Sequence, residues 1–383
     1  MIAYDKKSIE ALAIRKHAVG WFKLNLIDEV TKINIFNAHQ TKFKTTTLFS
    51  KIGVFIFTLL AAIFASGSLS GLVGLGGSEI GAGIMILIFG GVGTFLLENM
   101  IKSKNLYRSG IDNALVYFSS WSILVGIALI INNGPEQLGL TYFFACIIFT
   151  GYSIRYSDVL TTILAYVSLL FFIYVLLSNL SFSIIPFSFM ILSAIIYVIT
   201  KRKLSDNKLK YWTSCIQTLR ILSLLSFYMA GKYYVIRTMT VEMLHFYHEE
   251  GKDIPIAIVF FIFTAIIPLL YIYYALKTKD RLILLTGIII TVFSALTFKA
   301  RFSVGHPEIL LTLVGALVIF IAYISIKYLK TPKHGFTNDA DQNFEELEAL
   351  AIVQTFKPSH AANDSKIEMG GGKFGGGGAG SEF

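Results

Sequence analysis

The sequence predicts an all-α protein, a polytopic transmembrane helix bundle of about ten spans. Composition is the first reason: of 383 residues, 55% are hydrophobic and 15% are charged. Soluble domains average roughly 45–50% apolar and about 25% charged residues. The second is a mean hydropathy of +0.66. The third is patterning, because the apolar residues gather in blocks of roughly 20, the length that crosses the hydrocarbon core of a bilayer.

Residues 1–48 are predicted to form cytoplasmic amphipathic helices. The stretch "KKSIEALAIRKHAVGWFKLNLIDEVTKINIFNAHQ" predicts two of them, because apolar residues recur at roughly helical spacing with Lys and Arg between them. The pair could lie on the anionic inner leaflet of the membrane. Packing against the cytoplasmic face of the bundle is an equally good interpretation.

Residues 49–330 are predicted to form the ten-span bundle. The fourth and fifth spans are the least distinct, since only "SIRYSD" separates them. The spans are expected near 51–69, 82–100, 112–131, 139–153, 158–178, 182–200, 212–231, 254–276, 281–298 and 308–328.

The basic residues of the short connections predict the orientation. If the N-terminus is cytoplasmic, most of the 33 Lys and Arg residues fall on that side, as the positive-inside tendency requires. Arg220 lies within a span. The opposite side receives only Lys232, Arg237, Lys252, Lys299 and Arg301. This asymmetry favours an even number of spans, both termini in the cytoplasm and a location in the cell inner membrane. It also accounts for the basic balance without a nucleic-acid partner.

Residues 331–383 are predicted to form a cytoplasmic C-terminal segment. It combines one short acidic helix in "DADQNFEELEALAIVQTF" with a flexible Gly-rich tail, "GGGKFGGGGAGSEF". The tail fits a native extension or an added linker. Beyond the lipid bilayer, the terminal helices offer a surface for a protein partner.

The plan is similar to uncharacterised bacterial polytopic membrane proteins, classed only as domains of unknown function. Those proteins carry short N-terminal cytosolic helices before a bundle of many spans. The resemblance rests on "WFKLNLIDEVTKI" (21–33) and the Gly-rich first hairpin that follows it. It implies the membrane-bundle fold and no particular activity.

Arg220 is the first candidate functional residue. An arginine in the middle of a span is costly, so its side chain should face protein or water. Thr213, Gln217, Arg220 and Ser223 fall on one stripe of a helix. The stripe could line a polar path in which Arg220 contacts an anion or a carboxylate. Alternatively, Arg220 has a structural role and forms internal hydrogen bonds. Its partners would then be Glu98, Asp112, Asp158 or backbone carbonyls.

The second candidate is an outer cluster around "MLHFYHEEGK" (243–252). If this segment is helical, Glu242, His245 and Glu249 share one face. These groups could relay protons or hold zinc, or they could belong to a solvated interfacial helix. The spacing matches no zinc motif, so neither a metal nor a cofactor is predicted. The full cluster is Arg237, Glu242, His245, His248, Glu249, Arg301, His306 and Glu308.

These candidates favour transport or sensing of a small solute or ion. Arg220 would be the buried anion contact, and His245 with Glu249 an outer protonatable pair. One alternative is a membrane-embedded enzyme that acts on a lipid-linked or periplasmic substrate, with His245 or His306 as general base. Another is a non-catalytic subunit of a membrane assembly. The sequence does not decide whether the protein is an enzyme.

Overall fold

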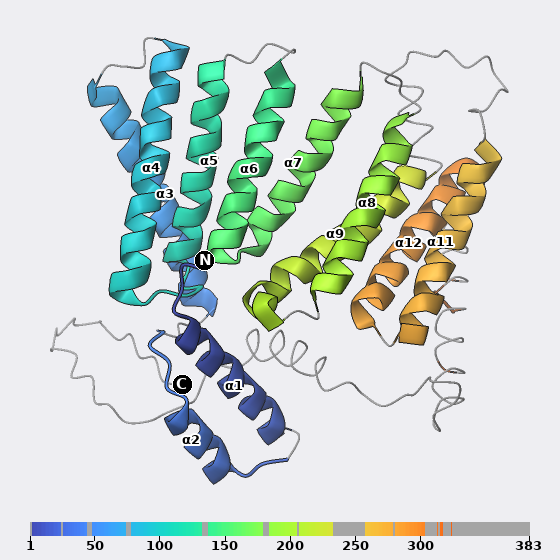
Figure 1. Cartoon of the computed structure of the whole chain (residues 1–383), viewed down its shortest axis with the longest axis horizontal. Coiled ribbons are helices and arrows are strands. Elements are labelled where there is room, and N and C mark those ends of the chain that lie inside the picture. Colours follow the sequence, from blue (N-terminus) through green and yellow to red (C-terminus); the bar gives the residue numbers. More distant parts are fainter. Residues whose placement is uncertain are drawn as a thin grey trace, which may run out of the picture. The chain divides into compact units, whose positions relative to one another are not determined.

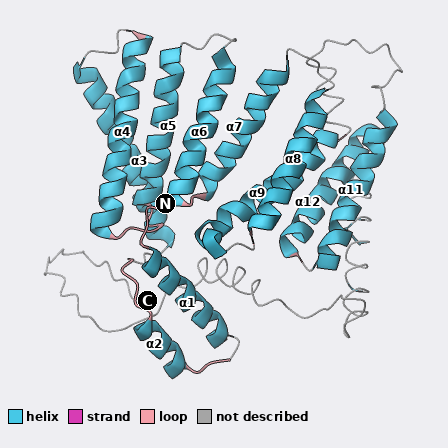
Figure 2. Ribbon diagram, in the orientation of Figure 1, coloured by secondary structure: helices cyan, strands magenta, loops and turns pink. Residues whose placement is uncertain are grey.

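The structure of the chain is a computed structural model, and its described residues form an all-helical protein. Among them every regular element is a helix and none is a strand, so the all-α prediction is confirmed (Figure 2). All lie in the compact unit Met1–Ala340. The described residues are 2–23, 26–43, 48–73, 78–131, 137–178, 184–204, 207–232, 257–278, 280–302 and the isolated positions 312, 315, 316 and 323.

Two short helices precede the bundle, α1 (Lys6–Lys23) and α2 (Glu29–Ala38), as predicted. The first nine predicted spans coincide with helices (Figure 1). The tenth, 308–328, lies outside the described residues apart from the isolated positions. The bundle elements are α3 (Leu48–Val73), α4 (Glu79–Lys104), α5 (Ile111–Ile131), α6 (Leu138–Tyr156), α7 (Val159–Ser178), α8 (Ile184–Lys203), the 3-10 helix η3 (Asn207–Trp212), α9 (Thr213–Gly231), α11 (Ala257–Thr278) and α12 (Arg281–Phe302).

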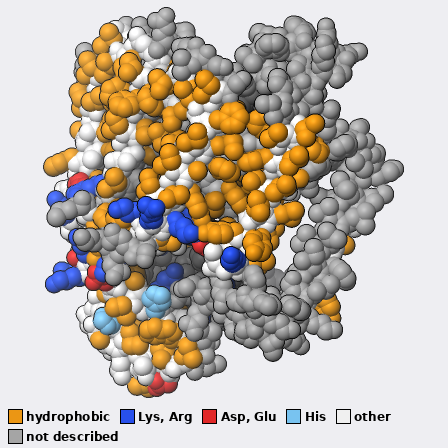
Figure 3. All heavy atoms as spheres, turned by 45° about the vertical axis from the view of Figure 1, so that its right-hand side comes forward, with side chains coloured by type: hydrophobic (Ala, Val, Ile, Leu, Met, Phe, Trp, Pro, Cys, Tyr) orange, Lys and Arg blue, Asp and Glu red, His pale blue; other side chains and the backbone are white. Residues whose placement is uncertain are grey.

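Seven helices within the described part of the chain are long and apolar enough to cross a membrane. They are α3, α4, α5, α6, α7, α8 and α11. Large hydrophobic side chains point outward from them, including Phe57 at 74% exposure and Phe95 at 70%. Figure 3 shows such side chains as a broad band over one face of the molecule. Outward apolar surface of this extent is stable in lipid and unstable in water.

The helices pack mainly in pairs, α4 with α5, α6 with α7, α8 with α9 and α11 with α12, and α4 lies very close to α5. Small residues allow this approach, as is common between membrane helices. A Cβ atom added at Gly126 of α5 would lie only 2.7 Å from the backbone nitrogen of Leu87 in α4. At Gly90 of α4 it would lie 2.6 Å from Cγ1 of Ile123. The glycines therefore set the distance between these two helices.

The α6–α7 boundary is a genuine two-residue turn. Ser157 adopts a left-handed conformation with φ of 51°, and the Asp158 carboxylate accepts a hydrogen bond from the Thr161 N–H (2.8 Å), capping α7. The other carboxylate oxygen of Asp158 accepts from the Tyr117 hydroxyl of α5 (3.0 Å). Two helices therefore meet here, as predicted, but the connection is shorter than expected: residues 153–156 of "SIRYSD" belong to α6, and only Ser157 and Asp158 lie between the helices.

Asp112 organises the α4–α5 turn in a similar way. It is fully buried, and its oxygens accept from the backbone N–H groups of Arg108 (2.7 Å) and Ser109 (2.8 Å). The Tyr4 hydroxyl from the N-terminal segment also donates to Asp112 (3.0 Å). Burial and the neighbouring carboxylate raise the pKa of Tyr4, so this hydroxyl stays a hydrogen-bond donor.

The N-terminal segment packs on the end of the bundle where these turns lie. Ile2 and Tyr4 are buried in one hydrophobic cluster with residues of α4, α5 and α6. The Ala3 N–H donates to the Arg155 carbonyl (2.8 Å). In α1, Glu10 pairs with Lys210 of η3 (2.7 Å). Of the two placements left open by the sequence, these contacts support packing on the bundle for α1.

The connections that meet at this end are alternate ones along the chain. Tyr4 contacts Asp112, which follows the α4–α5 turn. Ala3 contacts Arg155, which lies just before the α6–α7 turn. Ser157 of the α6–α7 turn donates to the Tyr211 carbonyl of η3 (2.7 Å), which places the α8–α9 connection there too. Successive helices that run in opposite directions bring every second connection to the same end of the bundle.

We expect Asp112→Ala to lower the free energy of unfolding by about 3 kcal/mol, because several buried donors lose their acceptor at once. Thermal unfolding followed by circular dichroism in detergent measures the change. Asp28→Ala is the matched control, since Asp28 caps the exposed helix α2 through the Thr31 N–H (3.2 Å). Equal losses of unfolding temperature in the two variants would contradict the role of Asp112.

The Glu10 contact predicts a pH response of α1. Hydrogen bonds from Lys210 and Tyr211 hold the pKa of Glu10 below its usual range, so the contact stabilises docking above the unfolded value of about 4.3. This stabilisation is lost as pH falls through the lower, folded value. Because intrinsic amide exchange slows as pH falls, the protection factor, which is the intrinsic rate divided by the observed rate, is the quantity to compare, and in α1 it should fall in acid. Glu10→Gln should remove this fall and Glu29→Gln should retain it; an unchanged fall in Glu10→Gln would count against the prediction.

Candidate functional site

Arg220 lies on α9, which, like α12, is not one of the seven candidate spans found among the described residues. Arg220 is 4% exposed and Ser223 is fully buried, while Thr213 and Gln217 are half-buried. The Thr213 hydroxyl donates to the Lys210 carbonyl and the Ser223 hydroxyl to the Arg220 carbonyl (both 2.8 Å). These two hydroxyls are thus directed at their own backbone rather than along the stripe.

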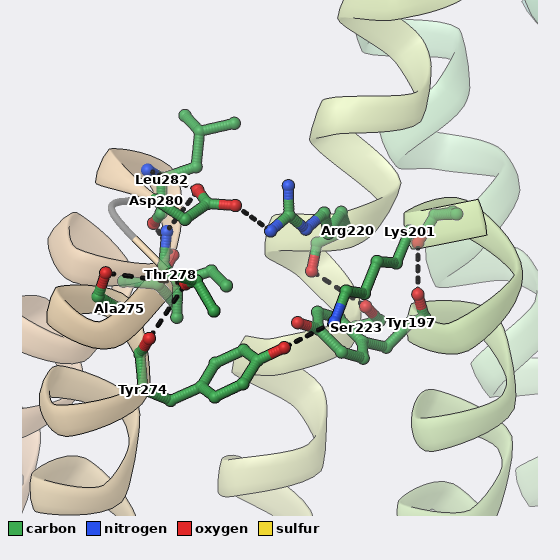
Figure 4. A network of polar contacts seen from close by, with 12 residues as sticks. Tyr197, Lys201, Arg220, Ser223, Tyr274, Ala275, Thr278, Asp280 and Leu282 are labelled. Carbon is green, nitrogen blue, oxygen red and sulfur yellow. Dashed lines mark hydrogen bonds and ion pairs between the residues drawn. The ribbon is translucent and has the colours of Figure 1, made fainter. Parts of the chain in front are cut away.

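Asp280 is the carboxylate partner of Arg220 (Figure 4). It lies in the turn between α11 and α12, where its backbone N–H donates to the Ala275 carbonyl (3.0 Å). One carboxylate oxygen accepts from the Arg220 guanidinium. The other accepts from the N–H groups of Leu282 (3.1 Å) and Ile283 (3.4 Å). Asp280 therefore caps α12 and neutralises Arg220 at the same time.

This pairing corrects the partners expected from sequence. Of the three proposed acids, Glu98 is bound by Arg155 through two hydrogen bonds of 2.8 Å. Asp112 and Asp158 hold helix starts and tyrosine hydroxyls. Because α9 packs against both α11 and α12, Arg220 comes close to the turn that joins these two helices. The signal for Asp280 in the sequence was an acid two residues before an apolar run, which is a helix-start pattern.

Aromatic and basic side chains from α8 and α11 surround the ion pair. The Arg220 guanidinium carbon lies 5.8 Å from the centre of the Tyr197 ring, close enough for a cation–π contact. The Lys201 ammonium binds the Tyr274 hydroxyl at 2.5 Å. The site therefore contains two cations, Arg220 and Lys201, and one anion, Asp280, so its net charge is positive. Figure 4 shows these side chains converging from three directions.

One donor of Arg220 is unused. Within the described part of the chain, the buried Nε of Arg220 has no hydrogen-bond partner, and neither has the hydroxyl of Tyr197. A buried polar group without a partner costs free energy. A guanidinium normally binds planar oxyanions through two donors in parallel. The site can therefore accept a carboxylate-like or phosphate-like group as well as, or in place of, Asp280.

A second polar cluster was missed from sequence. The hydroxyls of Tyr166 on α7, Ser193 on α8 and Ser226 on α9 meet in the bundle, with Ser193 and Ser226 2.8 Å apart. Ser226 is three residues after Ser223, so it extends the polar side of α9. Serine and tyrosine are common enough in spans that spacing alone did not single them out. The cluster joins three helices by hydrogen bonds.

The predicted outer cluster falls almost entirely outside the described residues. Arg301 belongs to α12, but its side chain is not described. In the described part of the chain, no group of three His, Cys, Asp or Glu side chains could hold a metal ion. The members outside the described residues are Arg237, Glu242, His245, His248, Glu249, His306 and Glu308.

Comparisons of the chain with protein-family models, curated proteins and solved structures give no match. The resemblance to uncharacterised bacterial membrane proteins therefore stays a prediction.

We expect the Arg220–Asp280 pair to show strong energetic coupling. Arg220→Leu and Asp280→Asn should each lower the free energy of unfolding by about 3 kcal/mol, because each leaves a buried charge without its partner. The asparagine retains a capping oxygen for α12. The double variant should lose about 2 kcal/mol less than the sum of the single losses.

A double-mutant cycle in detergent, read by unfolding, measures this coupling. The matched control is the cycle of Arg155→Leu and Glu98→Gln. That pair is more accessible, with 39% and 22% of the side-chain surfaces exposed, so its coupling should be smaller. Additive losses at Arg220 and Asp280 would show that the contact contributes nothing to stability.

Proposed function

We propose that the chain is a multi-pass membrane protein that transports or senses a small solute or ion through the Arg220–Asp280 site. The observation that carries the proposal is a buried guanidinium with one carboxylate partner and an unused donor. Ionisable groups among membrane helices are costly and commonly serve function. The net positive charge of the site favours an anion.

The proposal includes ten spans and a location of both termini in the cytoplasm, in a cell inner membrane. Its support is the gathering of alternate connections at one end together with the N-terminal segment. Basic residues mark the connections at that end, among them Lys102 and Lys104 of α4 and Lys201 to Lys203 of α8. Connections rich in Lys and Arg favour the cytoplasmic side.

Asp280 supplies the means of coupling, because its two oxygens hold different elements. A proton on Asp280, or an anion that replaces it on Arg220, weakens the link between α9 and the α11–α12 turn. The arrangement with the intact pair and the one with the separated pair then differ in affinity for the ligand. A ligand shifts the balance between two such arrangements only through this difference.

Flux measurements in liposomes test the proposal. The purified full chain is reconstituted, and uptake of protons, chloride, phosphate and acetate is followed with dyes and isotopes. Wild-type protein should carry at least one of these, or its unfolding temperature should rise with phosphate or acetate if it is a sensor. Arg220→Leu should abolish either response while circular dichroism shows an intact helix content.

Arg155→Leu is the matched control, since it removes the arginine of a second arginine–carboxylate contact, one between α4 and α6. It should retain the response. An absence of both flux and thermal shift in wild-type protein would overturn the proposal. A full response in Arg220→Leu would do the same.

A further inference from the structure

A cavity of about 690 Å³ lies among α6, α7, α8, η3 and α9. Figure 1 shows the α6–α7 pair beside the α8–α9 pair. The volume falls in the range of about 300–1,000 Å³ typical of small-molecule sites. Arg220 is not part of the lining. The lining residues are Cys146, Thr150, Ser153, Ile154, Thr162, Ala165, Tyr166, Leu169, Ile196, Ile199, Thr200, Lys203, Leu209, Trp212, Cys215, Ile216 and Leu219.

The walls suit a hydrocarbon occupant. Most lining side chains are apolar, and key polar ones already have partners within the protein. Ser153 and Thr162 bond each other at 2.6 Å, and Thr200 donates to the Ile196 carbonyl at 2.8 Å. The Cys215 thiol donates to the Asp158 carbonyl. Because these polar groups already have partners, an alkyl chain can occupy the cavity without leaving any of their hydrogen bonds unmade.

Positive charge lies at the end of the cavity formed by the α8–α9 connection. Lys201, Arg202 and Lys203 form the last turn of α8, and Lys203 is the one that lines the cavity. Trp212 also lines the cavity, and its indole N–H donates to the Ile154 carbonyl (2.8 Å). Tryptophan and lysine beside an apolar interior are typical of the level of lipid headgroups.

We propose that this cavity binds one acyl chain of an anionic phospholipid, with the headgroup phosphate at Lys203. The chain lies between the α6–α7 and α8–α9 pairs, and the charge of Lys203 selects anionic over zwitterionic lipid. Because Arg220 does not line the cavity, the inference is independent of the transport or sensing function.

Fluorescence quenching of Trp212 by brominated lipid tests the inference. The chain has three tryptophans, so Trp21→Phe with Trp121→Phe leaves Trp212 as the sole reporter. The protein is placed in nanodiscs of phosphatidylcholine that contain brominated phosphatidylglycerol or brominated phosphatidylcholine. Brominated phosphatidylglycerol should quench at the lower mole fraction. Lys203→Gln should reduce this preference about fivefold, the effect expected from one lysine near anionic lipid.

Arg202→Gln is the charge control, because Arg202 is the adjacent basic residue and does not line the cavity. It should retain the preference. A second comparison fills part of the cavity with a larger side chain. Cys146→Phe should weaken quenching by brominated phosphatidylglycerol. Ile147→Phe, on the outward surface (53% exposed), should not. Equal quenching by the two lipids in wild-type protein, or equal effects of Lys203→Gln and Arg202→Gln, would overturn the inference.

Discussion

Buried polar groups among membrane helices must find their partners inside the protein, and this constraint explains the arrangement of the aspartates. Where side chains pack over a turn, water reaches neither the helix start nor the carboxylate, and both need partners from the protein. Asp112, Asp158 and Asp280 each accept backbone N–H groups at a turn and a side chain from a distant element. The distant partners are Tyr4, Tyr117 and Arg220. Each carboxylate thus closes a turn and joins two parts of the chain with the same group.

The three aspartates differ in what they bind, and this difference sets Asp280 apart. Tyrosine hydroxyls are neutral donors, so the contacts of Asp112 and Asp158 can be permanent and structural. Asp280 instead holds a buried cation, and such a pair contributes little net stability when intact while costing much when one partner is lost. That imbalance suits a site whose state changes with a proton or a competing anion. It is the physical basis for the role proposed for the Arg220–Asp280 site.

Two chemically distinct regions therefore lie on the two sides of α9. Arg220 is directed toward α11 and α12 with Asp280, whereas Ile216 and Leu219 line the apolar cavity shared with α6, α7 and α8. Ser226 continues the polar contacts toward Tyr166 and Ser193. A helix with mixed surroundings cannot be uniformly apolar. This explains why α9 differs from the seven apolar helices of the described chain.

The sequence by itself determined the helical class and the position of nearly every described helix, and seven of the predicted spans are helices of membrane-crossing length. Those properties depend on local composition and on the length of apolar blocks, which residues within one segment specify. It also singled out Arg220, because one charge in an apolar block is visible without a fold. Only the tertiary structure decided that Asp280 pairs with Arg220, that the N-terminal segment packs through Tyr4 on Asp112, and that α6, α7, α8, η3 and α9 line a cavity. Such contacts join residues separated by 60 or 108 positions. Their choice among several acids depends on how the helices pack, which no local pattern records.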